Sequence, residues 1–140
     1  MKIRKIHTDN YQRLQTLNII QLDFTLRTHA KSISSGYMDL IIEERTHLDQ
    51  FLSPETKGYS LAHYFVQNGD MCSDPFMQIH INNENQWVAA HSFQQDLPPF
   101  HSEVFPEPKM YKPALEKELN QFLSDWLQNL IDQDHGKHWE

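Results

Sequence analysis

Six histidine and aspartate residues between positions 63 and 96 have side chains that could do acid–base chemistry. They are His63, Asp70, Asp74, His80, His91 and Asp96. An imidazole exchanges protons near neutral pH, and a carboxylate can orient it or bind a hard metal ion. Within the set, His63 with Asp70 and Asp74 would form the catalytic group of a small hydrolase, with or without a metal.

The spacing of these residues matches no diagnostic catalytic or metal-binding motif. The chain contains no HExxH, GxSxG or GxxxxGK[ST] pattern, and its single cysteine, Cys72, has no neighbouring base. The segment 68–74 also lacks the alternating acidic ligands of an EF-hand loop. His63 is therefore interpreted first as a half-buried sheet residue. We expect no catalytic residue, no bound metal and no cofactor.

A second polar set lies at the ends of two expected strands. Its members are Tyr64, Gln67, Asn68, Asp70, Gln94 and Asp96. In an antiparallel meander these strand ends lie close together, so the side chains would share one surface. Binding a protein needs a few desolvated anchors and no tuned pKa. The set is the candidate partner-binding surface, and local strand-end hydrogen bonds are its alternative role.

The elements that would position both sets indicate an α+β fold. Alternating apolar and polar residues predict strands over 37–45, 59–67, 76–82 and 86–94, which would pair in an antiparallel sheet of about four strands. Between the second and third strands, Asn68 and Gly69 suit a type I′ hairpin turn. Pro75 would interrupt the returning strand, which favours a longer loop over 68–74. The segment 96–113 contains five prolines and is expected to lie unpaired across the surface.

Helices are expected at both ends of the chain. Asp9 can cap a first helix that runs to about Arg27, and Pro113 suits the first turn of a second one. The second helix has apolar residues at steps of three and four. They are Leu115, Leu119, Phe122, Leu123, Trp126, Leu127, Leu130 and Ile131. This stripe must pack on the sheet, which leaves Glu116, Lys117, Glu118 and Asp125 on the solvent side.

The composition fits one domain over residues 1–140, with mobile ends at 1–8 and 134–140. The 140 residues are 39% hydrophobic, which suffices for a single core. Twelve Lys and Arg against nineteen Asp and Glu give a net charge of -7, which disfavours nucleic acid and anionic lipid. One cysteine excludes an internal disulfide. Without an apolar run long enough for a membrane span or a secretory signal, the expected location is the cytoplasm.

Four segments resemble a family of small proteins of unknown function from plasmids, conjugative elements and phages. They are YMDLIIEE, SLAHYFVQNGDMCSDPFM, FQQD and LNQFLSDWLQNL. The resemblance covers about residues 37–133, and the last segment also resembles a related bacterial domain-of-unknown-function family. It implies an α+β fold and a mobile-element setting, where genes that blunt host defence are common neighbours. It implies no activity, cofactor or site residue.

These observations favour a non-enzymatic accessory protein that binds a protein partner, as an anti-defence inhibitor or an adaptor. One alternative is the small hydrolase built on His63 and nearby aspartates. Another is a regulator that binds a small ligand or nucleic acid. The sequence does not identify the partner, and a homo-oligomer is compatible with it.

Overall fold

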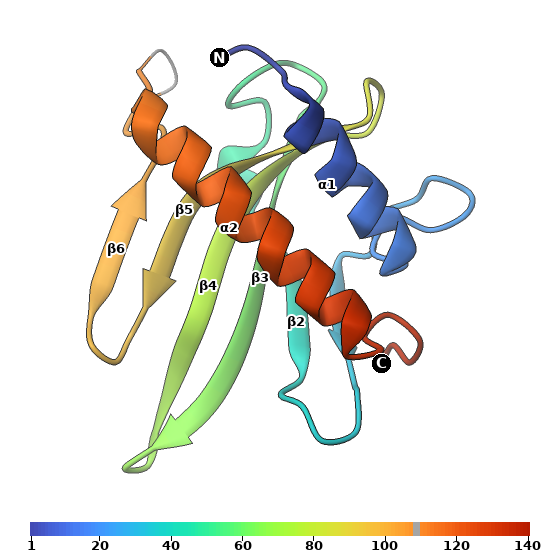
Figure 1. Cartoon of the computed structure of the whole chain (residues 1–140), viewed down its shortest axis with the longest axis vertical. Coiled ribbons are helices and arrows are strands. Elements are labelled where there is room, and N and C mark those ends of the chain that lie inside the picture. Colours follow the sequence, from blue (N-terminus) through green and yellow to red (C-terminus); the bar gives the residue numbers. More distant parts are fainter. Residues whose placement is uncertain (108–109) are drawn as a thin grey trace.

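A computed structural model describes residues 1–107 and 110–140, which form one six-stranded antiparallel sheet and two α-helices (Figure 1). The strands are β1 (His29–Ser32), β2 (Leu40–Glu44), β3 (Thr56–Gln67), β4 (Asp70–Asn82), β5 (Trp87–Gln95) and β6 (Phe100–Glu103). The helices are α1 (Lys5–Thr16) and α2 (Pro113–Asp132), with a short 3-10 helix η1 (Thr46–Leu48). Neighbouring strands follow chain order from β1 to β6. The α+β class is confirmed, but the expectation of about four strands was wrong.

The two strands that the sequence did not predict are the edge strands β1 and β6. Each has only four residues, HAKS and FHSE, and neither carries an apolar alternation. An edge strand pairs on one side only and can be short and polar. β6 lies in the proline-rich segment that was expected to stay unpaired. It fits because Pro99 and Pro106 flank it, while Pro108 lies outside the described residues.

β3 and β4 are joined by a tight turn at Asn68 and Gly69, so the longer loop that we expected over 68–74 was wrong. The two turn residues have φ of 53° and 81°, as a type I′ turn requires. Gln67 pairs with Asp70 directly across this turn. Pro75 is accommodated because the register shifts between Ala62 and Tyr64, where the ladder is already irregular.

The N-terminal helix begins and ends earlier than expected. It runs from Lys5 to Thr16, with Arg4 at the N-cap position, whereas the sequence predicted a helix from Asp9 to about Arg27. Asp9 lies inside the helix and pairs with the Lys5 ammonium at 2.8 Å. The chain leaves helical geometry at Asn18, which has φ of 58°. Residues 19 and 20 still reach the core, which explains their apolar character.

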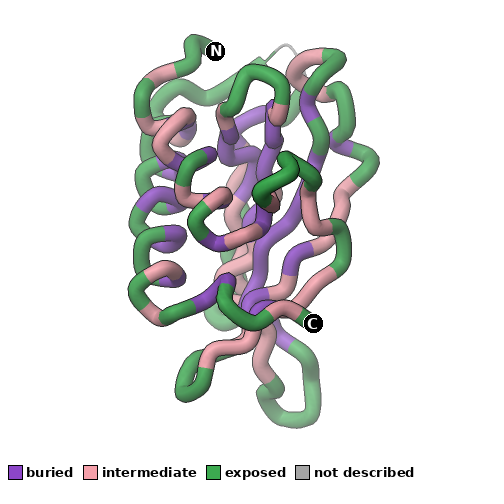
Figure 2. Tube along the Cα trace, turned by 90° about the vertical axis from the view of Figure 1, so that its right-hand side faces the viewer, coloured by how far each residue is buried: buried purple, intermediate pink, exposed green. Residues whose placement is uncertain are grey.

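Both helices lie on one face of the sheet, and α2 crosses the strands diagonally (Figure 1). Five residues of the predicted α2 stripe are buried: Leu119, Leu123, Trp126, Leu127 and Leu130. They join one core cluster with the inward residues of β2 to β5 and with α1. Figure 2 shows buried residues along the facing sides of helices and sheet, with exposed loops at the lower end. The amphipathic pattern of α2 therefore correctly predicted that the apolar stripe of this helix packs on the sheet.

Glu116 differs from the other residues expected on the solvent side of α2, because it is buried between α2 and α1. Its Oε1 accepts hydrogen bonds from Arg4 Nη2 and His7 Nε2, both at 2.8 Å, and from Asn120 Nδ2 at 3.1 Å. Asn120 Oδ1 in turn accepts from the backbone N–H of Ala90 in β5 at 3.0 Å. This network joins both helices and the sheet through buried polar groups.

The ends of the chain contact the rest of the fold. His7 is fully buried under α2. At the other end, the N–H of Lys31 donates to the carbonyl of Glu140 at 2.9 Å, and the N–H of Glu140 donates back at 2.8 Å. Trp139 Nε1 also donates to the carbonyl of Leu17 at 3.1 Å. The mobility of residues 1–8 and 134–140 stays a prediction.

Candidate functional site

The β3–β4 hairpin projects beyond the rest of the sheet (Figure 1). Its last paired position with β2 is Ala62, and the last with β5 is Phe76, beyond which the Asp96 N–H still donates to the Ser73 carbonyl at 3.0 Å. Residues 65–67 and 70–72 pair only with one another. Val66 and Met71 are partners across this outer part and are 65% and 68% exposed. Two large apolar side chains together in water are typical of a contact surface.

A shallow groove of about 380 Å³ lies at the base of the hairpin. Its lining residues come from the loop before β2, from β2 and from both hairpin strands. They are Asp39, Ile41, Tyr64, Phe65, Val66 and Met71. Asp39 is the only charged residue among them, and its carboxylate lies 3.9 Å from Lys31 Nζ. The groove is suited to an apolar side chain of a binding partner.

The structure divides the six predicted partner-binding residues into two groups. Asp96 and Gln94 lie at the base of the hairpin, where Asp96 Oδ2 accepts from the Ser73 N–H at 2.7 Å and Oδ1 accepts from Gln94 Nε2 at 3.4 Å. Tyr64 is the strand partner of Ser73, so it belongs to the same group. The Ser73 N–H is the main cause of a lowered pKa of Asp96.

The other three residues, Gln67, Asn68 and Asp70, surround the exposed turn. The structure therefore gives Asp96 the strand-end hydrogen bonds that were its alternative role. The turn residues can form the polar rim of the apolar surface. The sequence analysis missed Val66 and Met71. Their symmetric spacing about Asn68 and Gly69 was the available signal, because a type I′ turn makes them direct partners.

His63 is held in one tautomer by two partners. Its Nδ1 lies 2.8 Å from the carbonyl oxygen of Asp39 and so carries the proton, while Nε2 accepts from Trp126 Nε1 at 3.3 Å. Burial is the main cause of its lowered pKa, and it is opposed first by the hydrogen bond to the Asp39 carbonyl and then by the charges of Asp39 and Asp74. Asp70, which the hydrolase alternative groups with His63, lies at the β3–β4 turn. The hydrolase alternative stays a prediction, and it requires His63 to exchange one of its partners for substrate.

His80 and His91 meet on the neighbouring strands β4 and β5. His80 Nε2 lies 2.9 Å from His91 Nδ1, and Phe51 stacks on His80 with ring centroids 5.4 Å apart. His91 Nε2 also lies 3.8 Å from Glu103 Oε1. Within residues 1–107 and 110–140, no group of three or more potential ligands is arranged for a metal ion. The expected absence of metal from the purified protein stays a prediction.

Buried neutral histidines predict a loss of stability in acid. Burial lowers the pKa of His80 to about 3, so between pH 6.5 and that value the unfolded chain binds a proton that the folded chain does not. Each pH unit then costs about 1.4 kcal/mol for such a histidine, or about 2 kcal/mol for His80 at pH 5. The free energy of unfolding from urea melts should therefore fall from about pH 6.5 downward.

The His80→Gln variant should show a shallower fall because it lacks the buried imidazole. The matched control is His138→Gln, since His138 is exposed and should leave the pH dependence unchanged. Equal unfolding free energies at pH 7 and pH 5 in the native sequence would contradict this assignment of a buried neutral pair.

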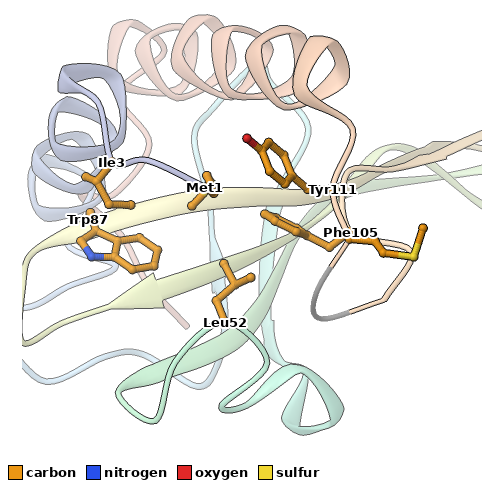
Figure 3. Close-up of a pocket in the computed structure, with 7 residues that line it drawn as sticks. Met1, Ile3, Leu52, Trp87, Phe105 and Tyr111 are labelled. Atoms are coloured by element: carbon orange, nitrogen blue, oxygen red, sulfur yellow. The ribbon is translucent and has the colours of Figure 1, made fainter.

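A second pocket, of about 440 Å³, lies at the end of the molecule that holds the N-terminus (Figure 3). Its lining residues are Met1, Ile3, Leu52, Trp87, Phe105, Met110 and Tyr111. None of these side chains is acidic, basic or a histidine. Phe105 also stacks on His91, with centroids 6.0 Å apart. The sequence did not predict this pocket because four distant segments contribute to it.

These features define a small α+β protein with an exposed apolar pair on a projecting hairpin and a pocket lined by apolar and aromatic side chains. Over residues 9–136 the chain matches the family model described as "Domain of unknown function (DUF6908)", and it belongs to that family. The expected membership of an uncharacterised domain family is confirmed. No curated protein and no solved structure matches the chain. Neither described helix is long and apolar enough to cross a membrane.

Proposed function

We propose that the protein is a non-enzymatic accessory protein that acts by binding a protein partner through the β3–β4 hairpin. The exposed Val66 and Met71 pair carries this proposal, because its 65% and 68% exposure leaves apolar surface that a partner would cover. The adjoining groove can receive one apolar side chain of the partner as an anchor. Gln67, Asn68 and Asp70 supply a polar rim around this centre, as in other protein interfaces.

The geometry of the hairpin favours binding in two further ways. The type I′ turn and the paired strands hold Val66 and Met71 in place, so little conformational freedom is lost on association. The net charge of -7 favours a partner with a basic surface, which would speed encounter and make it sensitive to salt.

The biological setting in the proposal rests on the sequence resemblance described above. We place the protein in the cytoplasm of a host of plasmids or phages, where it would act stoichiometrically as an inhibitor of host defence or as an adaptor. A survey of gene neighbourhoods in the family tests this setting. Consistent location among ordinary chromosomal genes would remove it without affecting the proposed hairpin interface.

A second candidate function is the binding of a small apolar ligand, which the pocket near the N-terminus favours. Its volume of about 440 Å³ falls in the range of ligand sites, and Trp87, Phe105 and Tyr111 offer aromatic faces. The fluorescent probe anilinonaphthalene sulfonate tests this candidate. Binding that Trp87→Ala weakens, with the fold retained, would support a small-ligand regulator.

The main proposal predicts that a Val66→Ser and Met71→Ser double variant loses its partner. A photo-crosslinking residue at position 67, beside the apolar pair, would first identify the partner in the native host. With that partner purified, the double variant should bind at least about tenfold more weakly than the native sequence in a titration, because each truncated anchor loses buried apolar contact. The combined Tyr64→Ala and Asp70→Ala variant should weaken binding in the same assay.

The matched control is Leu22→Ser, since Leu22 is 97% exposed on the turn after α1 and lies outside the hairpin. It should bind as tightly as the native sequence. Unchanged binding by the double variant would place the interface elsewhere. Multiple turnover of any substrate by the native sequence, abolished by His63→Ala, would instead favour the hydrolase alternative.

A further inference from the structure

The two edges of the sheet differ in how their backbone groups are satisfied. At β1, residues 138–140 pair with the edge, since the N–H of Ile33 donates to the carbonyl of His138 at 3.0 Å and Lys31 pairs with Glu140. At the opposite edge, β6 pairs with β5 over residues 100–103. Within the described part of the chain, no other backbone hydrogen bond reaches these four residues. Figure 1 shows β6 as the outermost strand of the sheet.

Aromatic side chains border this open edge on the helix side. Phe100 packs on Phe93 with centroids 6.0 Å apart, and Phe93 packs on Phe122 of α2 at 5.1 Å. Phe100 and Phe122 remain 54% and 38% exposed. An open edge with an apolar flank is a template for a further strand. The backbone row specifies an extended chain as the occupant, since its N–H and C=O groups need partners at strand spacing.

The residue pattern of β6 indicates which extended chain would fit. If two copies of β6 pair antiparallel about Ser102, His101 of one copy lies opposite Glu103 of the other, and symmetry makes this pair twice. An imidazole N–H on one strand can donate a hydrogen bond to a carboxylate opposite it, whereas like charges in these positions oppose pairing. In this register Ser102 of one copy lies directly opposite Ser102 of the other.

We propose that the protein forms a symmetric dimer in which β6 of one copy pairs antiparallel with β6 of a second copy, centred on Ser102. The two sheets become continuous across the seam. Because the two-fold axis is perpendicular to the sheet, the helices of both copies lie on the same side, and the exposed Phe100 and Phe122 of each copy flank the seam there. The interface uses the edge strand β6, so it is separate from the proposed hairpin function.

The register is tested by disulfide formation in the full chain. In a Cys72→Ser background, Ser102→Cys places two thiols opposite one another and should give an interchain disulfide under mild oxidation. His101→Cys in the same background is the matched control, because position 101 faces position 103 and not itself. Crosslinking at position 102 and not at 101 is the expected result. Equal crosslinking at both positions, or none at 102, would overturn the proposed register.

The association itself is tested by sedimentation velocity from about 1 to about 200 µM, where the native sequence should approach twice the 16.6 kDa mass of one chain. His101→Glu and Glu103→Lys should each weaken the dimer about tenfold, because the first places two carboxylates opposite one another and the second removes the carboxylate that faces His101. An equimolar mixture of the two variants should recover the dimer, since carboxylate then faces ammonium. Glu103→Lys also removes the contact between Glu103 and His91 within the same chain. Mixing the two variants does not restore that contact, so the recovery reports the seam between the copies.

Glu55→Lys is the control for net charge, since Glu55 is exposed just before β3, which is separated from β6 by β4 and β5. It should leave the dimer unchanged. A native chain that stays monomeric over the whole concentration range would overturn the proposal. So would a dimer that survives both charge variants unchanged, because its interface would then lie elsewhere.

Discussion

Trp126→Ala should lower the free energy of unfolding by about 3–5 kcal/mol, the range for removing a large buried aromatic side chain. Trp126 is buried in the stripe of α2 that packs on the sheet, and it contacts Phe122 and His63. Its Nε1 also donates to His63 Nε2 at 3.3 Å, so truncation leaves a buried acceptor without its donor. Urea melts at pH 7 measure the change.

Trp126→Phe separates the two contributions to this loss. The phenyl ring keeps most of the apolar contact but lacks the N–H, so this variant should lose only about 1–2 kcal/mol, close to the cost of an unsatisfied buried group. A loss below about 1 kcal/mol for Trp126→Ala would mean that α2 contributes little to the core. It would also undermine the fixed tautomer assigned to His63.

Glu116→Ala should lower the free energy of unfolding by about 3 kcal/mol, the lower end of the range for breaking a buried ion pair. Burial is the main cause of a lowered pKa of His7, so its ring is neutral. Its Nδ1 accepts a hydrogen bond from the backbone N–H of Arg4 at 2.9 Å. The proton is therefore on Nε2, which donates to Glu116. Without Glu116 this buried donor has no acceptor. Arg4 loses less, because its partly exposed guanidinium can turn to water.

Glu116→Gln retains a hydrogen-bond acceptor for His7 and should cost less than half as much. Glu118→Ala is the matched control on the exposed side of the same helix and should change the unfolding free energy by less than about 0.5 kcal/mol. Equal effects of Glu116→Ala and Glu118→Ala in denaturant melts would contradict the buried network between α1 and α2.

The sequence by itself determined the central elements of this fold. The α2 stripe and the alternation in β3, β4 and β5 follow from burial of one face, which imposes a period of 3.6 or 2 on the residues. These elements could be predicted because the pattern is local to each of them. The same local reasoning offered a type I′ turn at Asn68 and Gly69 but preferred a longer loop there, and it placed Asp96 at the end of a strand.

Tertiary structure decided the edges and the buried polar groups. β1 and β6 carry no apolar pattern of their own, because backbone pairing holds them: β1 pairs with β2 and with residues 138–140, and β6 pairs with β5. Glu116 lies on the face that the pattern assigned to water, and only the arrival of Arg4 and His7 on another helix makes its burial tolerable. The pairing of His80 with His91 likewise depends on the register of β4 and β5.

The residues of the candidate site also divide into those that the sequence predicted and those that only the structure showed. The polar residues at the hairpin ends could be predicted, whereas the exposed Val66 and Met71 were hidden by the assumption of a longer loop. A strand register is set by the whole set of cross-strand contacts, so a single proline within a bulge does not break it. Local periodicity therefore determined α2 and the central strands. The positions of groups distant in sequence were decided by packing, because burial of a charge or an apolar pair depends on what lies opposite.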